Sequence, residues 1–113
     1  MIVYRVENEN GQGPWYNSKF DCFDLGWDYG EIYPGPQSDE LINKSNDELE
    51  KILNDKILFG CQTIELIIHW FENASQLLTE HNYDIVKYEI SDEHVIIGQY
   101  QCVFAKSKAK KLN

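Results

Sequence analysis

Apolar and polar residues alternate near both ends of the chain. Over residues 2–7, Ile2, Tyr4 and Val6 alternate with Val3, Arg5 and Glu7. Residues 84–90 and 95–104 show the same alternation, with a polar turn at 91–94. Because successive side chains of a β-strand point to opposite faces, these three segments predict strands, the first with one half-buried face. The short turn between the last two segments predicts a β-hairpin.

The middle of the chain has helical spacing instead. Ser45-Asn46-Asp47-Glu48 fits a capping box, in which Ser45 caps the Glu48 amide and Glu48 reaches back, and the helix that follows is expected to run to about Lys56. The segment that contains this helix is expected to end at Phe59-Gly60. A second helix is expected after Thr63. Its expected inner face consists of Ile64, Ile67, Ile68 and Phe71. A third is expected to begin at Asn73 or Ser75 and to end at Asn82 in a left-handed conformation.

This order of elements predicts an α+β fold. We expect a small antiparallel sheet, made of the N-terminal strand and the C-terminal hairpin, with two or three helices packed on one face. Residues 1–105 form a single domain in this prediction, and residues 106–113 form a basic, flexible tail. Residues 15–37 are rich in aromatic side chains, glycine and acids, and they predict only a short helix near 18–25.

The charge of the chain is strongly negative and unevenly placed. The net charge is −9, yet four of the ten basic residues lie after residue 105. Residues 20–50 hold nine acids against Lys44 alone. Such a field repels nucleic acid and anionic membranes and attracts basic protein surfaces. The three cysteines have no paired spacing, the first residues do not have the pattern of a signal peptide, and no apolar run is long enough to span a bilayer, so a reducing cytoplasm is expected.

One segment combines acids with aromatic side chains. Asp21, Asp24, Asp28 and Glu31 are spaced to form one stripe if the segment is helical. This acidic stripe would match the spacing of phosphates on nucleic acid, so it predicts contact with a groove that binds nucleic acid in another protein. Trp15, Trp27 and Tyr33 would anchor such a contact. The alternative is a solvated acidic face beside ordinary core aromatics, and the two glycines in the segment favour that alternative.

The sequence offers little for catalysis or metal binding. Glu65, His69 and Glu72 share a helix face, but zinc sites need a fuller ligand set. The cysteines lack a neighbouring histidine or a Cys-X-X-Cys motif, so a thiol nucleophile is not expected. We expect no metal and no cofactor, and the balance of the residues is against an enzyme.

Short motifs along the chain resemble those of a family of uncharacterised short phage and prophage proteins. They are Tyr4-Arg5, Gly13-Pro14-Trp15-Tyr16, Phe59-Gly60, Trp70-Phe71, Gln99-Tyr100-Gln101 and Phe104. An arginine on the first strand and a polar pair on a late strand also resemble ADP-ribosyltransferase-type NAD domains. That resemblance implies that Arg5 holds the cofactor and that Gln101 takes the place of a glutamate. Glutamine lacks the negative charge that stabilises a ribosyl cation. An ordinary strand with Arg5 paired to a surface acid is the competing interpretation.

Together these features favour a small acidic interaction protein of phage origin. The leading hypothesis is a stoichiometric inhibitor of a host defence complex that handles nucleic acid, of the anti-CRISPR kind, acting in the host cytoplasm on a basic protein surface. It would contact neither nucleic acid nor membrane directly. The alternatives are an NAD-binding, ADP-ribosyltransferase-like domain that uses Arg5 and Gln101, and a self-associating phage structural component.

Overall fold

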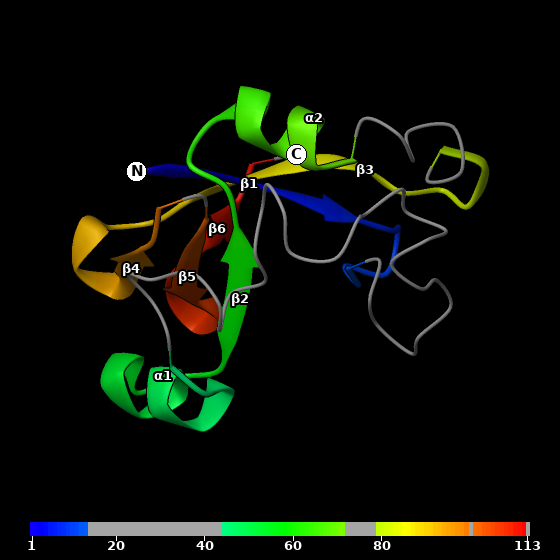
Figure 1. The fold of residues 1–113 in the computed structure, drawn as a ribbon. Helices are drawn as coiled ribbons and strands as arrows, with labels where there is room; N and C mark the ends of the chain where they lie inside the picture. Colours follow the sequence, from blue (N-terminus) through cyan, green and yellow to red (C-terminus); the bar gives the residue numbers. More distant parts are fainter. Residues whose placement is uncertain (14–43, 72–78, 100, 113) are drawn as a thin grey trace.

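The computed structural model describes residues 1–13, 44–71, 79–99 and 101–112, which form two small sheets and two α-helices (Figure 1). The strands are β1 (Ile2–Glu7), β2 (Ile57–Gly60), β3 (Asp84–Glu89), β4 (Val95–Ile97), β5 (Cys102–Ala105) and β6 (Lys110–Lys111). The α-helices are α1 (Asn46–Leu53) and α2 (Ile64–Phe71), and the short 3₁₀ helices are η4 (Asp92–His94) and η5 (Lys106–Lys108). The predicted α+β class is confirmed.

Both sheets are antiparallel and three-stranded. The first has the order β1-β3-β6 and the second the order β2-β5-β4. They join where Tyr4 and Cys61 exchange both backbone hydrogen bonds, at 2.8 and 2.9 Å. Gly60 makes this junction possible, because a Cβ there would lie 2.5 Å from Val3 Cγ1 and 2.8 Å from the Tyr4 carbonyl oxygen.

Two core clusters of the described residues lie on the two faces of the second sheet. On one face, Val3 and Ile90 pack with Cys102 and Phe104, which connects the two sheets. On the other face, Leu49 of α1 packs with Val103. Burial of apolar side chains on both faces of these short strands stabilises the second sheet. The second sheet therefore lies between α1 and the first sheet.

The pairing of the C-terminal strands differs from the predicted hairpin. β3 pairs with β1 and β6, whereas β4 and β5 form their own hairpin within residues 95–105. The turn is closed by the Gly98 N–H, which donates to the Gln101 carbonyl at 2.8 Å. The alternation of residues 95–104 continues across this turn and therefore predicts one strand where the structure has two. The sequence pattern does not predict β2, which is only four residues long.

The C-terminal residues differ from the predicted flexible tail. β6 pairs with β3, and the Leu112 N–H donates to the Lys87 carbonyl at 2.9 Å. Upstream, the backbone N–H and hydroxyl of Ser107 both donate to the Asp55 carboxylate. Lysine runs usually mark solvated termini, but here one lysine meets a buried carboxylate, as described below.

The predicted helix signals are largely confirmed. The Ser45 hydroxyl accepts from the Glu48 N–H at 3.2 Å, and Thr63 caps α2 by accepting from the Leu66 N–H. Asn82 is left-handed, with φ of 65°. The helix expected to reach Lys56 ends at Leu53, because Asn54 also adopts a left-handed conformation, with φ of 54°. The other two predicted helices fall mainly on residues 18–25 and 72–78, outside the described residues.

The expected inner face of α2 is only partly correct. Ile67 is buried, but Ile64 and Ile68 are exposed. Among the described strands, α2 packs mainly against β1. A helix that packs on one strand buries a narrower stripe than the four-residue apolar pattern predicts.

Candidate functional site

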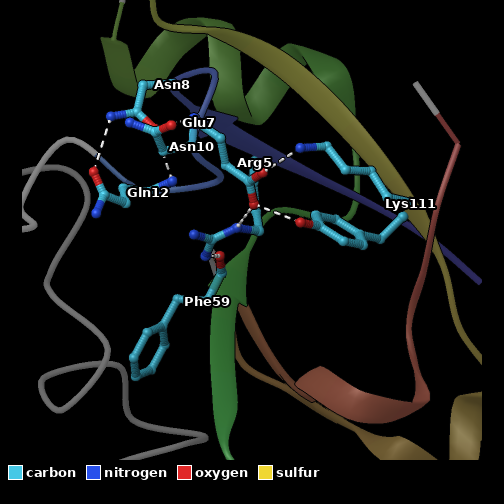
Figure 2. A network of polar contacts seen from close by, with 8 residues as sticks. Arg5, Glu7, Asn8, Asn10, Gln12, Phe59 and Lys111 are labelled. Atoms are coloured by element: carbon cyan, nitrogen blue, oxygen red, sulfur yellow. Dashed lines mark hydrogen bonds and ion pairs between the residues drawn. The ribbon is translucent and has the colours of Figure 1, made fainter.

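The most organised polar cluster surrounds the buried carboxylate of Glu7, at the end of β1 (Figure 2). One carboxylate oxygen accepts from Arg5 Nε and from the Tyr88 hydroxyl, each at 2.7 Å. The other accepts from Lys111 Nζ at 2.8 Å. The cluster therefore joins β1, β3 and β6, and it holds two cations around one anion.

Alternation along β1 explains why these side chains meet. Val3, Arg5 and Glu7 share the face that turns toward the second sheet, and Val3 lies in the core there. The sequence predicts one half-buried face for this strand, whereas Val6 on the opposite face is buried as well. The strand thus buries residues on both faces, and a charged pair can be buried because each charge finds hydrogen-bond partners.

The hydrogen bonds of the cluster set the protonation state of Glu7. Burial alone raises the pKa of this carboxyl, but the hydrogen bonds from Lys111, Tyr88 and Arg5 outweigh it and bring the pKa below its ordinary value. Burial, followed by the bond to Glu7, raises the pKa of Tyr88 to about 12. At neutral pH, Glu7 is therefore an ionised acceptor and Tyr88 a neutral donor. Neither group titrates near neutral pH, as a general acid or base would need to.

Arg5 also satisfies a free backbone carbonyl. The Lys106 N–H donates to the Lys56 carbonyl, and along the β2–β5 ladder every second residue of β2 then bonds to β5. Phe59 is one of the residues between, so its carbonyl points away from β5. Arg5 Nη1 donates to that carbonyl. The arginine thus links the edge of β2 to β1 and is only 11% exposed. The competing interpretation, an ordinary strand in which Arg5 pairs with an acid, describes Arg5 well. The acid is Glu7, however, and it is buried rather than on the surface.

The loop after Glu7 is held by hydrogen bonds among its own residues. The Asn8 side-chain oxygen accepts from the backbone N–H groups of Asn10 and Gln12, each at 2.9 Å. Asn8 Nδ2 donates to the Gln12 side-chain oxygen at 3.2 Å, and Gly11 supplies the positive φ of 77° that this turn requires. The loop places Gly13 beside the Arg5 guanidinium and leads directly into residues 14–43.

Gln101, the second residue of the NAD alternative, lies in the other sheet. It precedes β5, it is buried, and its backbone carbonyl closes the β4–β5 turn. Arg5, in contrast, lies on β1 and directs its guanidinium at Glu7 and Phe59. The described hydrogen bonds of Arg5 are therefore those of a residue that holds the fold together.

The described cysteines are poor nucleophiles. Burial raises the pKa of both Cys61 and Cys102 to about 12, so each is a neutral thiol at physiological pH. Across the described ranges, no group of three or more potential metal-binding side chains comes together. In the same part of the chain, no helix is long and apolar enough to cross a membrane.

The acidic stripe and its aromatic neighbours lie outside the described residues. These are Asp21, Asp24, Asp28, Glu31, Trp15, Trp27 and Tyr33, all within residues 14–43. In sequence that segment holds six acids and a single lysine, a net charge of −5 over 30 residues. The partner-binding surface proposed from the sequence therefore remains a prediction.

Sequence reasoning missed the cluster around Glu7. Its members come from three strands, and Tyr88 and Lys111 are 81 and 104 residues away from Glu7 along the chain. The available signal was the position of Glu7 on the same strand face as Val3 and Arg5. A charged residue on an otherwise buried face requires a partner of opposite charge.

Comparison with known proteins places the chain in a phage protein family. The model of the bacteriophage T4 Y00F protein family matches residues 1–113, the whole chain. No curated protein and no solved structure matches it.

Proposed function

We propose, since the chain belongs to the bacteriophage T4 Y00F protein family, that it is a small phage interaction protein acting by stoichiometric binding in the host cytoplasm. Its target would be a host defence complex that handles nucleic acid, which makes it an inhibitor of the anti-CRISPR kind. The observation that carries this proposal is the concentration of negative charge in one aromatic-rich segment.

The charge supports a protein partner with a basic surface. Residues 14–43 contribute −5 to the net charge of −9. Carboxylates such as Asp21, Asp24, Asp28 and Glu31 would pair with the arginines and lysines that otherwise grip phosphate groups. Such charges mainly raise the rate of association, whereas buried aromatic anchors such as Trp15, Trp27 and Tyr33 slow dissociation. Inhibition would follow from occupation of the site that nucleic acid normally uses.

The described surface next to this segment adds further acids. Asp47 and Glu48 are exposed on the first turn of α1, directly after the segment. Glu50, one turn later, is paired with Lys56 at 3.8 Å. The start of α1 would therefore extend the acidic surface, while its end is locally neutralised.

Recovery of a partner from host lysate tests the proposal. The stripe variant changes Asp21, Asp24 and Asp28 to Asn and Glu31 to Gln. A matched control changes four exposed glutamates elsewhere, Glu9, Glu65, Glu80 and Glu89, to Gln, which removes the same charge. We expect wild type and control to recover the same basic protein, and the stripe variant to lose it, with the wild-type complex weakened by a high-salt wash. Equal recovery by the stripe variant would show that the acids serve solubility alone.

The alternative function is an NAD-binding, ADP-ribosyltransferase-like domain that uses Arg5 and Gln101. The engagement of Arg5 by Glu7 and Phe59 weighs against it, since NAD would have to compete for the same guanidinium. A thermal-shift measurement with NAD distinguishes the two functions. Stabilisation by NAD would favour the alternative, and an unchanged melting temperature would favour the interaction protein.

A further inference from the structure

The outer edge of β4 carries backbone groups that its own sheet does not use. Gly98 and Gln101 form a hydrogen-bonded pair at the β4–β5 turn. Hydrogen-bonded and non-hydrogen-bonded pairs alternate in an antiparallel ladder, so Ile96 and Val103 form the next hydrogen-bonded pair. The backbone N–H and carbonyl groups of Val95 and Ile97 therefore point away from β5. The Val95 N–H donates to the Asp92 carbonyl of η4. Within the described ranges, the Val95 carbonyl and the Ile97 N–H and carbonyl have no backbone partner.

The two outer edges of the joined sheets differ in their protection. β6 forms one edge and carries Lys110 and Lys111, which discourage pairing with another strand. β4 forms the other edge and consists of Val95, Ile96 and Ile97, all apolar and β-branched. The Ile97 side chain is 46% exposed. An apolar edge without a charged residue is a template for strand addition.

Two acidic residues close to β4 favour a basic strand as the one that adds to this edge. Asp92 and Glu93 lie in η4, the short helix that precedes β4, and are exposed. Asp92 lies 3.4 Å from the amino group of Met1, and Glu93 lies 3.4 Å from His94 Nε2. Even with these neighbours, the entry to the edge carries two carboxylates in a chain of net charge −9. A basic strand would be attracted there, and a second acidic copy of this chain would be repelled.

We propose that β4 is a docking edge for an extended, basic segment of the protein partner, which adds as a fourth strand antiparallel to β4. This inference rests on the proposed function, because it takes a basic partner as given and names the element that receives it. The added strand accepts a hydrogen bond from the Ile97 N–H and donates to the Val95 and Ile97 carbonyls. Its apolar residue covers the exposed Ile97 side chain, and its basic residues lie beside Asp92 and Glu93.

A peptide assay tests the edge directly. The probe is a short, dye-labelled peptide of alternating lysine and valine, titrated with the full chain and followed by fluorescence anisotropy at low salt. Its counterpart of alternating glutamate and valine tests the charge preference. We expect the lysine peptide to bind and the glutamate peptide to bind at least about tenfold more weakly. Failure of the lysine peptide to bind wild type, or equal binding of both peptides, would overturn the proposal.

Variants at Ile97 locate the site. Ile97→Pro removes the outward N–H and leaves the β5 ladder bonds at Ile96 and Gly98 in place. Ile97→Lys adds a charge at the edge, and Ile68→Lys on α2 is its matched control, since Ile68 is 49% exposed. We expect both Ile97 variants to weaken peptide binding by about tenfold or more relative to Ile68→Lys. Binding of the Ile97 variants that equals the control would contradict a site at β4.

Two further measurements test the docking edge without relying on the folding of the Ile97 variants or on the proposed function. In wild type, the Ile97 amide should show a large chemical-shift change and slower hydrogen exchange when the peptide binds. Chemical-shift changes confined to other strands would contradict the proposal. A dimer of the chain that forms without peptide and that Ile97→Lys dissociates would also contradict it, because a second copy would then occupy the edge. The acidic-stripe variant should still bind the peptide. If it does so while recovering the lysate partner unchanged, the stripe proposal fails and the docking edge stands.

Discussion

Replacing Arg5 by methionine removes the central donor of the buried cluster and keeps an unbranched apolar stem in its place. Two interactions disappear, the 2.7 Å bond from Nε to Glu7 and the bond from Nη1 to the Phe59 carbonyl. Glu7 keeps its bonds from Tyr88 and Lys111, but it loses the cation that is most deeply buried beside it. The Phe59 carbonyl, at the free edge of β2, loses the donor it has in the native fold.

The expected cost follows from these two losses. A hydrogen bond to a charged group contributes about 1.5–3 kcal/mol, and a buried carbonyl left without a partner costs about 1–3 kcal/mol. Water reaches this edge in part, because Arg5 is 11% exposed, so we expect Arg5→Met to lower the free energy of unfolding by about 3 kcal/mol. Lys111→Met removes a cation that is 39% exposed, and we expect it to cost about 1 kcal/mol.

Urea unfolding followed by circular dichroism and tryptophan fluorescence measures both variants. Since small domains are stable by roughly 5–15 kcal/mol, the Arg5 variant should unfold at much lower urea and remain folded in buffer. The ordering of the two variants is the critical result. If Lys111→Met destabilises the protein as much as Arg5→Met, the ion pair at the C-terminal strand dominates, and the reasoning from burial is wrong.

Three further predictions concern other contacts. The pKa of Glu7 in the fold lies below its ordinary value of 4.5, so the stability that Glu7 provides is present above 4.5 and is lost as the pH falls through the lower value in the fold. Wild type and Glu7→Gln should therefore converge in melting temperature as the pH is lowered below 4.5. Gly60→Ala should cost about 1–3 kcal/mol in urea unfolding by forcing a Cβ onto Val3, whereas Gly13→Ala, whose nearest contact is 3.5 Å, should change little; equal effects would argue against the close approach at Gly60. Ser45→Ala should cost about 1 kcal/mol through the lost cap of α1, and no change in unfolding would mean that the cap contributes nothing.

Local patterns in the sequence predicted local structure well. The alternation of residues 2–7, the caps at Ser45 and Thr63 and the left-handed Asn82 are each determined by neighbouring residues, and all are present. Choosing which strands pair is a different problem. The apolar alternation of β3 fits β4 as well as β1, and only the packing of both sheets around Val3 and Phe104 distinguishes the two pairings.

The site could be predicted only in part. Arg5 was identified as a residue of interest, but its partners Tyr88 and Lys111 are distant in sequence, so no spacing reveals them. The lysines at the C-terminal end predict a solvated tail unless the buried charge of Glu7 is known. The acidic stripe from Asp21 to Glu31 rests on sequence alone and awaits the lysate experiment.

The strand order also constrains when this protein can fold during synthesis. β1 is made first but pairs along its length with β3, and the second sheet needs β4 and β5, which lie within residues 95–105. The second sheet therefore cannot be completed before β5 has been made, and the first sheet not before β6. The nascent chain must keep Val3 and Leu49 away from other apolar surfaces until then, and the domain should form in a single late step.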